Sequence, residues 1–419
     1  MTNHNLLIFE LGYGGHYASY IRYLAKYWCQ EKLLGTLNFV VSPSFVEQHP
    51  DVIAIAKNNS STNLNFIAIA PQETANLIPR KNSIYRAVRS FQEWKLLGKY
   101  AKKLKATHCL LLYFDSFQAA ITLSTLASPI ASGLKLPCPF SGIYFRPTFH
   151  YPSFLNYSPT KKEILQHLRE KFIILPRVMS HPQLANLFCL DPFVVKHLKR
   201  FNSSVKAIHL PDPVPLKEIE DKSKLAEFKQ SLGIEKERKI FLLFGALYDR
   251  RKGLDRILEA ISLLSPDLCG KLCLLLVGQI YLSDNSALER QITEVVQKYP
   301  VQIIIRDEFV PEKDVQLYYQ SADVILAPYQ RHVGMSGTLV HAAAAQRPLL
   351  TSDYGLMGEI TRQWQLGLTV DSTLPNKISK GLSYCLENSP KNLGDHTKMK
   401  AFAMTNSTEL FVEVIFQNV

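Results

Sequence analysis

The sequence predicts an α/β protein with two doubly wound, parallel-sheet domains in tandem. Three observations predict it. The chain has 419 residues, enough for two large domains. Short apolar runs alternate with helical stretches in both halves of the chain. The composition, 47% hydrophobic and 20% charged, supports full cores and excludes disordered and fibrous classes. We expect the two domains to face each other across a cleft at the carboxyl ends of their strands, where such sheets bind ligands.

The first half opens with an apolar strand, a glycine loop and a helical pattern, the usual start of a doubly wound domain. Further apolar runs of four to six residues predict more strands. The strands predicted in this half are residues 6–9, 37–41, 66–70, 109–114, 141–145 and 172–175. An apolar period close to 3.6 residues predicts a long helix over residues 81–105, whose other face is strongly basic.

The second half repeats this alternation without repeating the sequence. Its predicted strands are residues 239–245, 272–278, 302–306, 324–327 and 348–352, and its predicted helices are 253–264, 287–298, 313–321 and 337–345. A last helix is predicted over residues 398–416. Three prolines within residues 211–215 disfavour regular structure and mark a domain boundary. We therefore predict domains over 1–212 and 213–395, and a C-terminal helix in 396–419 that packs back on the first domain.

Charge is unevenly divided between the halves. Residues 1–212 hold 24 Lys and Arg against 11 Asp and Glu, whereas residues 213–419 hold 24 against 25. This asymmetry indicates an anionic partner for the first half. The seven cysteines form no CxxC pair, no apolar run is long enough to span a membrane, and the first residues lack the features of a signal peptide. These features favour a cytoplasmic protein over secreted or integral-membrane classes.

The strongest candidate site is a basic loop. Arg250, Arg251 and Lys252 follow a predicted strand and precede a predicted helix. A helix amino end favours anions, and three cations there add charge for a diphosphate. The alternative is a solvated basic loop without a ligand.

A second candidate lies before the Ala-rich helix of residues 337–345. Gly334, Ser336 and Gly337 are small, so backbone amides there can approach an anionic ligand closely. The alternative is an ordinary turn in which Ser336 caps the helix.

Taken together, several motifs resemble family 4 retaining glycosyltransferases of the GT-B fold. They are G-A-L…R-K-G-L-D-x-I-L-E-A, S-A-D-V-I-L-A-P-Y and S-G-x-L-x-x-A-x-A-x-x-x-P-L-L-x-S-D-Y-G, and the match covers about residues 240–372. The N-terminal Gly-Gly-His loop matches more loosely. The resemblance implies a GT-B fold, with a nucleotide-sugar donor held by the second domain and the acceptor by the first.

Roles follow from the resemblance at matching positions. Lys252 takes the place of the diphosphate-binding lysine, and Arg250 or Arg251 replaces a family arginine for which Ala246 stands here. Backbone groups at Phe309 and Val310 are expected to contact the base. The amides expected to meet the sugar and phosphates are those of Gly334, Met335, Ser336, Gly337 and Thr338.

The family's paired glutamates are not preserved. Val333 and His341 occupy their positions. His341 is expected to hydrogen-bond the ribose hydroxyls, with a buried core histidine as the alternative. His332, beside Val333, is the polar group that could substitute for the first glutamate, with an exposed loop residue without a role as the alternative.

In the first domain, Gly14, Gly15 and His16 follow the first strand, where the glycines let a loop approach the donor phosphates. Asp115 ends another strand, and we expect it and His16 to contact the reacting sugar or the acceptor as catalytic residues. The alternative for Asp115 is an N-cap of the following helix. Arg146 also follows a strand and is expected either to bind an anionic acceptor or to pair internally.

The expected function is transfer of a hexose from a nucleotide-sugar, with a UDP-sugar favoured, to a lipid-linked or saccharide acceptor with retention. No metal or cofactor is expected, because there is no DxD motif and cations with helix dipoles can stabilise the leaving diphosphate.

The basic helix at 81–105 is expected to meet an anionic membrane surface, with a solvated helix as the alternative. No nucleic-acid-binding motif is found. The alternative function is an inactive GT-B subunit that binds nucleotide or glycan and supports a partner transferase; a phosphorylase or epimerase comes third.

Overall fold

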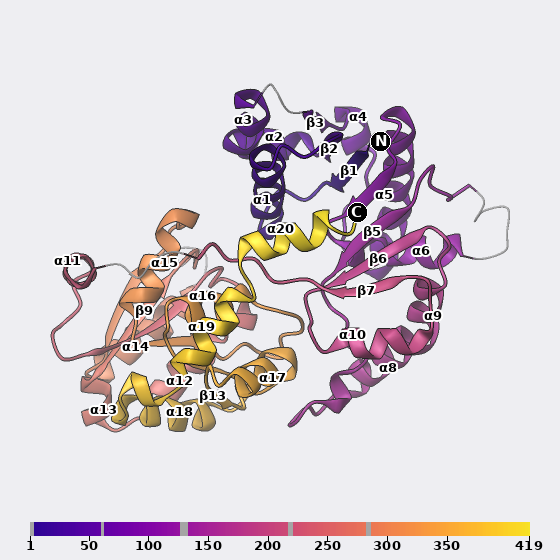
Figure 1. Ribbon diagram of the computed structural model, residues 1–419. Coiled ribbons are helices and arrows are strands. Elements are labelled where there is room, and N and C mark those ends of the chain that lie inside the picture. Colours follow the sequence, from indigo (N-terminus) through magenta and orange to yellow (C-terminus); the bar gives the residue numbers. More distant parts are fainter. Residues whose placement is uncertain (1–3, 60–62, 126–132, 217–220, 282–285) are drawn as a thin grey trace. The chain divides into compact units, whose positions relative to one another are not determined.

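The computed structural model describes residues 4–59, 63–125, 133–216, 221–281 and 286–419, which form two compact units (Figure 1). Unit 1 comprises Met1–His150, Pro159–Pro213 and Thr408–Val419. Unit 2 comprises Tyr151–Ser158 and Val214–Ser407. Each unit therefore includes a short segment from a distant part of the chain.

Unit 1 is built on a seven-stranded parallel sheet with the order β3-β2-β1-β4-β5-β6-β7. β1 pairs with both β2 and β4, so the strand order reverses direction between β1 and β4. In sheets of this kind, ligands bind beyond the carboxyl ends of the strands at such a reversal. The strands are β1 Asn5–Glu10, β2 Thr36–Val41, β3 Leu64–Ala68, β4 His108–Leu111, β5 Phe140–Tyr144, β6 Leu184–Cys189 and β7 Lys206–His209.

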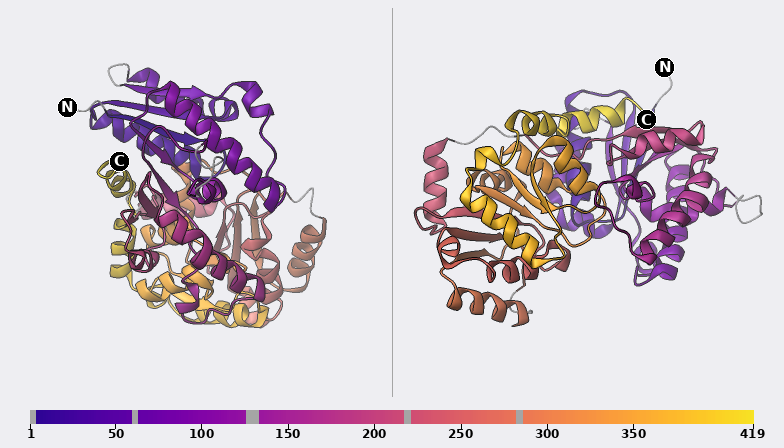
Figure 2. Two further views of the ribbon diagram at one scale, coloured as in Figure 1. Left: turned by 90° about the vertical axis from the view of Figure 1, so that its right-hand side faces the viewer. Right: turned by 90° about the horizontal axis from the view of Figure 1, so that it is seen from below.

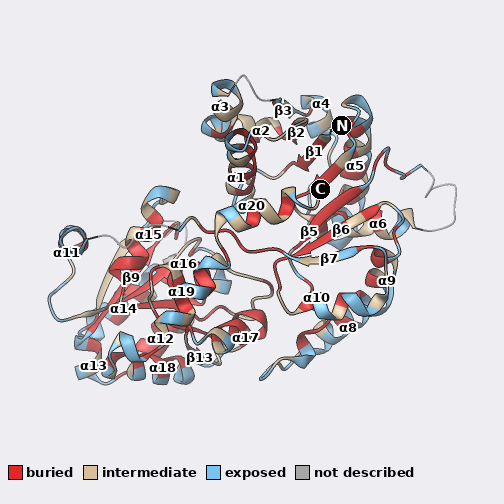
Figure 3. Ribbon diagram, in the orientation of Figure 1, coloured by how far each residue is buried: buried red, intermediate tan, exposed pale blue. Residues whose placement is uncertain are grey.

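Helices cover both faces of this sheet. On one face the core joins strand residues to α5, α6 and α9, whereas α1 packs with α3 and α20 on the other. The inner strands β1, β2, β4, β5 and β6 are almost entirely buried (Figure 3), whereas the edge strands β3 and β7 are partly exposed. The helices of unit 1 are α1 His16–Gln30, α2 Pro43–Gln48, α3 Pro50–Asn58, α4 Pro71–Ala75, α5 Ser83–Lys103, α6 Gln118–Ser124, α8 Lys161–Arg169, α9 Leu175–Met179, α10 Val194–Leu198 and α20 Thr408–Phe416.

The last helix of the chain belongs to unit 1. In α20, the Phe411 ring lies 4.8 Å from that of Tyr20, and the Phe416 ring lies 5.6 Å from Tyr27. Both tyrosines are on α1, so the end of the chain completes the aromatic packing around that helix.

Unit 2 is built on a six-stranded parallel sheet with the order β10-β9-β8-β11-β12-β13. β8 pairs with β9 and β11, which gives a second reversal of strand order. The strands are β8 Lys239–Phe244, β9 Leu272–Val277, β10 Gln302–Arg306, β11 Val324–Ala327, β12 Leu349–Ser352 and β13 Gly367–Val370.

The helices of unit 2 also form two layers (Figure 2). α12, α14 and α18 share one core with the strands, and α15, α16, α17 and α19 contact one another in the other layer. The helices are α11 Lys222–Ser231, α12 Leu254–Ile261, α13 Pro266–Gly270, α14 Ser286–Lys298, α15 Glu312–Ser321, α16 Gly337–Ala344, α17 Gly355–Trp364, α18 Pro375–Glu387 and α19 His396–Met404.

Two predicted elements are wrong. Residues 172–175 are helical, not a strand, because a short apolar run does not by itself distinguish the two. The single helix predicted over 398–416 is two helices, α19 and α20, which belong to different units. Strands β6, β7 and β13 were not predicted.

The helix predicted over 81–105 is present as α5. Trp94 and Leu97 are fully buried, and Glu93, also buried, binds Arg80 at 2.7 Å and Arg89 at 2.6 Å. The first turns differ from the prediction, because Ile84 is 74% exposed although it belongs to the predicted apolar stripe. Among the described helices, none combines the length and apolar character needed to cross a bilayer.

Candidate functional site

Two glycines bring together the ends of the neighbouring strands β8 and β9, whereas the reversal of strand order in unit 2 lies between β8 and β11. Gly245 follows β8 and Gly278 follows β9, with φ values of +115° and +122°. A Cβ on Gly278 would lie 2.0 Å from the Gly245 carbonyl oxygen. Only glycine fits this close approach of backbones at positive φ. The chain leaving β8 is thereby held against its neighbour.

Lys252 links the ends of β8 and β11, the two strands between which the strand order reverses. Its Nζ donates to the Phe244 carbonyl oxygen at 3.0 Å and to the Tyr329 hydroxyl. Phe244 ends β8, and Tyr329 follows β11, the strand on the other side of the reversal. The Tyr329 hydroxyl also bonds to Thr338 Oγ1 at 2.8 Å, at the start of α16. The predicted diphosphate-binding lysine therefore lies at the carboxyl ends of β8 and β11, and Tyr329 links it to Thr338, one of the predicted sugar-site residues.

The ammonium of Lys252 changes the acidity of Tyr329. Burial raises the pKa of the Tyr329 hydroxyl. The charge of Lys252 and the hydrogen bonds to Lys252, Thr338 and Ser336 lower this pKa by more than burial raises it. The net pKa is below the ordinary value of 10. An ammonium has three N–H donors. In the part of the chain that the structure describes, two of those of Lys252 have partners, which leaves one for a ligand.

The two arginines of the basic loop differ from Lys252. Arg251 pairs with Asp249 through a 2.5 Å contact, and its hydrogen bond is the main cause that lowers the Asp249 pKa. The Arg251 carbonyl accepts from Gln330 N–H at 2.7 Å, which ties the loop to the segment after β11. Arg250 begins the short 3-10 turn and is exposed.

The loop before α16 is positioned by a distant segment. Gly334 N–H donates to the Tyr151 hydroxyl at 3.0 Å, and Tyr151 is fully buried in unit 2. Ser336 occupies the N-cap position of α16, but its side chain makes no capping bond and turns to Tyr329 instead. A Cβ on Gly337 would meet no atom within 4 Å. The start of α16 is thus open beside the Lys252–Tyr329 pair.

The two histidines near this loop are held by the protein. His341 Nδ1 lies 3.3 Å from Gln316 Oε1, and its ring stacks on Tyr319 with centroids 5.0 Å apart. His332 is not in an exposed loop: burial lowers its pKa to about 4, and its ring meets Tyr329 edge-on. Phe309 and Val310 follow β10, and the Phe309 side chain is 77% exposed.

In unit 1, the predicted glycine loop lies at the other reversal of strand order. Gly15, with φ +64°, is the N-cap of α1, and a Cβ on Gly14 would meet no atom within 4 Å. His16, the first residue of α1, is exposed, with its ring 6.1 Å from Tyr20. Tyr20 in turn donates to the buried Asp212 at 3.0 Å. The structure gives Gly14 no packing role.

Asp115 and Arg146 lie together in unit 1. The Asp115 carboxylate accepts from Phe145 N–H at 2.8 Å and from Arg146 N–H at 3.2 Å, and Arg146 Nε lies 3.9 Å from it. Burial raises the Asp115 pKa, although Arg146 and the amides oppose it. Asp115 therefore binds the chain that leaves β5 rather than capping a helix at Phe117.

We predict that Asp115→Ala destabilises unit 1 by about 3 kcal/mol, because two amides lose a charged acceptor. Asp115→Asn keeps one acceptor oxygen, so its loss of stability should be about half that of Asp115→Ala. Urea unfolding of the three proteins measures this. Full stability in Asp115→Ala would contradict the structural role, and a stable but inactive Asp115→Asn would favour the catalytic one.

Glu10 is a buried carboxyl that the sequence did not indicate. It ends β1, is 8% exposed and accepts from Gly12 N–H at 2.7 Å. Burial raises its pKa to about 8, while the Gly12 bond and Arg80 lower it and Glu93 raises it. It lies at the reversal between β1 and β4, near the predicted glycine loop.

The raised pKa predicts a pH-dependent stability. An unfolded Glu10 titrates near 4.5, so between about pH 4.5 and 8 the folded protein holds a proton that the unfolded chain has lost. Stability should therefore fall as pH rises through this window. Glu10→Gln should remove up to a few kcal/mol of that fall. Melting temperatures across the window test it, with the exposed Glu47→Gln as control; equal pH profiles for wild type and Glu10→Gln would contradict it.

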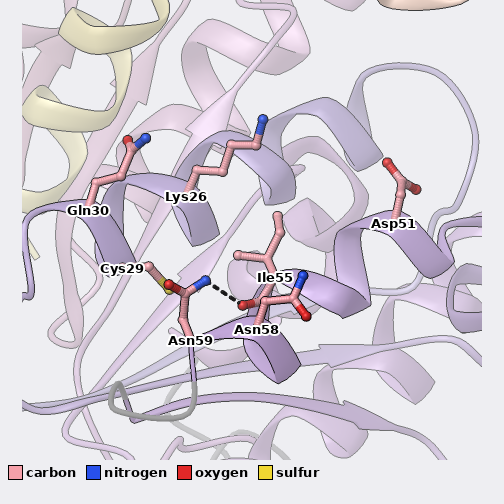
Figure 4. Close-up of a pocket in the computed structure, with 7 residues that line it drawn as sticks. All are labelled: Lys26, Cys29, Gln30, Asp51, Ile55, Asn58 and Asn59. Atoms are coloured by element: carbon pink, nitrogen blue, oxygen red, sulfur yellow. Dashed lines mark hydrogen bonds between the residues drawn. The ribbon is translucent and has the colours of Figure 1, made fainter.

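A surface hollow of about 350 Å³ lies in unit 1 between α1 and α3 (Figure 4). Lys26 and Gln30 line it from α1, and Asp51, Ile55 and Asn58 line it from α3. None of the predicted site residues lines this hollow. In the described part of the chain, no three His, Cys, Asp or Glu side chains form a group able to hold a metal ion.

Comparison with known proteins agrees with this architecture. Residues 238–388 match the family model for glycosyl transferases group 1. Sucrose-phosphate synthase from Thermosynechococcus elongatus is 15% identical at a TM-score of 0.66, over 99% of this chain and 98% of that one. A glycosyltransferase from Rickettsia africae is 13% identical at a TM-score of 0.65, over 100% and 98%. Anabaena HepE, solved in complex with UDP, is 12% identical at a TM-score of 0.64, over 99% of this chain and 98% of that one. No curated protein sequence matches the chain.

The chain has the GT-B fold. Strand–helix alternation predicted two parallel-sheet α/β domains, which the structure contains, and the GT-B structures match nearly the whole chain. The matched family model begins one residue before β8 and ends just after α18, so it includes Lys252, Tyr329 and α16.

Sequence reasoning did not single out Tyr329, Tyr151 or Glu10. Tyr329 ends the quoted S-A-D-V-I-L-A-P-Y motif, and its place after a strand was the signal that could have found it. Nothing in the sequence links Tyr151 to Gly334, 183 positions away.

Proposed function

We propose that the protein is a glycosyltransferase that takes a sugar from a nucleotide-sugar, a UDP-sugar being favoured, and passes it with retention to a lipid-linked or saccharide acceptor. The observation that carries the proposal is the position of Lys252, an ammonium with one N–H left for a ligand at the reversal of strand order in unit 2. The match of residues 238–388 to glycosyl transferases group 1 supports it, as does UDP in the similar Anabaena HepE.

In this proposal Lys252 binds the donor diphosphate and stabilises the negative charge that forms on it when the bond to the sugar breaks. The first amides of α16, from Met335 to Thr338, add their N–H groups and the helix dipole. Because these groups supply the positive charge, the proposed step needs no metal. Arg250 extends the site if its exposed side chain meets a phosphate.

We also propose that His341 contacts the ribose and that Phe309 and Val310 contact the base. For unit 1 we propose that Gly14, Gly15 and His16 meet the donor phosphates or sugar. Arg146 is proposed to face the acceptor. Asp115 already holds two amides, so we propose that it acts chiefly by placing Arg146.

A thermal-shift panel with UDP, GDP, ADP and their sugars, without added metal, tests the donor class. A ligand that binds the native state raises the melting temperature by mass action. We expect a selective shift with uridine nucleotides, and release of UDP from one UDP-sugar. Nucleotide binding without turnover by the pure protein, together with activity that appears only with a partner transferase, would favour the inactive-subunit alternative. The observation that motivates this alternative is that Val333 and His341 stand in place of the glutamates. No shift with any nucleotide would contradict the proposal.

A further inference from the structure

The helix that begins at α8 presents an apolar face outward. It continues from Lys161–Arg169 through a π-helical turn, Glu170–Ile174, into α9. One side is buried at His167, Glu170 and Leu175. The opposite side exposes five large apolar side chains: Ile164 (45%), Leu165 (69%), Leu168 (48%), Phe172 (65%) and Ile173 (52%). Pale-blue segments accordingly run along α8 in Figure 3.

The π-helical turn has a physical cause. Pro176 has no N–H to donate to the carbonyl of Phe172. The helix widens directly before it, and Leu175 N–H bonds to the Glu170 carbonyl instead. The helical backbone therefore continues while Phe172 and Ile173 stay exposed.

Charge around this face is positive. Lys161, Lys162, Arg169 and Lys171 are exposed. Of the two acidic residues of the segment, Glu170 is buried and Glu163 is half-buried in the capping box at the start of α8. Glu163 accepts from Thr160 N–H at 2.7 Å, and Glu170 accepts from Thr148 N–H at 3.2 Å and from the Tyr144 hydroxyl.

We infer that residues 161–173 are the surface by which the protein binds an anionic phospholipid bilayer. Exposed apolar side chains on a basic helix insert at the headgroup–acyl boundary, while lysines and arginines meet the lipid phosphates. A second copy of the same face is a poorer partner, because pairing would set like charges against each other. The inference does not depend on the transferase proposal.

This assigns the membrane contact to a different helix from the one the sequence predicted. Two cations of α5 already pair internally, Arg89 with Glu93 and Lys99 with Glu73. Much of its apolar face is buried around Trp94 and Leu97. Among the large apolar side chains of α5, only those of the first turns, Ile84, Tyr85 and Val88, are exposed.

The test is flotation of the full-length protein with vesicles of phosphatidylcholine, with and without phosphatidylglycerol. We expect binding only to the anionic vesicles, weakened by salt. The double variant Leu165→Ser/Phe172→Ser should lower the vesicle partition coefficient about tenfold or more. Both side chains are mostly exposed, so circular dichroism and the melting temperature should not change. Leu34→Ser, at an 80% exposed leucine elsewhere in unit 1, is the matched control.

A second comparison uses Ile84→Ser/Val88→Ser in α5, which should bind vesicles like the wild type. Three outcomes would overturn the inference: no binding of the wild type to anionic vesicles, unchanged binding of the Leu165→Ser/Phe172→Ser variant, or loss of binding in the α5 variant alone. Dissociation of a wild-type dimer by Leu165→Ser/Phe172→Ser, without an effect on vesicles, would assign the face to a second copy instead.

Discussion

Lys252→Ala is expected to lower nucleotide release from the preferred nucleotide-sugar by about 10²–10³-fold. The ammonium is the positive charge placed at the reversal between β8 and β11, and its loss removes both a ligand for the diphosphate and the charge that stabilises it as it leaves. The thermal shift produced by the nucleotide should disappear as well. The melting temperature of the ligand-free protein should change little, because Lys252 is only partly buried.

Lys271→Ala is the matched control. Lys271 is an exposed lysine in unit 2 directly before β9, at the amino-terminal edge of the same sheet. It should leave both turnover and the nucleotide shift unchanged. Wild-type turnover in Lys252→Ala would remove that residue from the proposed site, whereas loss of activity in both variants would indicate a general effect of surface charge.

Gly278→Ala is expected to destabilise unit 2 by about 3 kcal/mol or more. The new Cβ meets the Gly245 carbonyl at 2.0 Å, and the φ of +122° is unfavourable for alanine. The contact joins the ends of β8 and β9, so relief of the clash must move the chain that leads to Lys252. Calorimetric unfolding measures the loss, and a weaker nucleotide shift should accompany it.

Gly233→Ala separates the two causes. Gly233 also has a positive φ, +75°, but a Cβ there would meet no atom within 4 Å. Only the unfavourable φ then destabilises the alanine variant, so a loss of about 1 kcal/mol in the free energy of unfolding is expected. Equal losses for the two variants would show that the close approach of the strands contributes nothing.

The sheets and the place of the basic loop could be predicted because both depend on local patterns. Apolar runs separated by helical periods specify strands and crossovers, and a basic loop after a strand must lie at the strand's carboxyl end. Such local patterns do not show which strands lie side by side in the sheet. The bond from Lys252 to Tyr329 requires β11 to lie beside β8, although β9 and β10 come between them in sequence.

Errors arose where burial, rather than periodicity, decides. The run at 172–175 is apolar, yet Phe172 and Ile173 are exposed on a helix and only Leu175 is fully buried. The N-cap alternative for Asp115 is not observed, because its carboxylate binds two amides of a segment 30 and 31 positions away. Neither outcome is visible in local spacing.

The exchange of segments between the units has a consequence for biosynthesis. Unit 2 takes Tyr151, which binds Gly334, from a stretch translated before its own sheet, and unit 1 takes α20 from a stretch translated after the whole of unit 2. The core of unit 1 therefore cannot be completed until unit 2 has been translated, because Tyr20 and Tyr27 pack against Phe411 and Phe416. Cutting the gene between residues 213 and 214 would yield two fragments that each lack a piece of their own core.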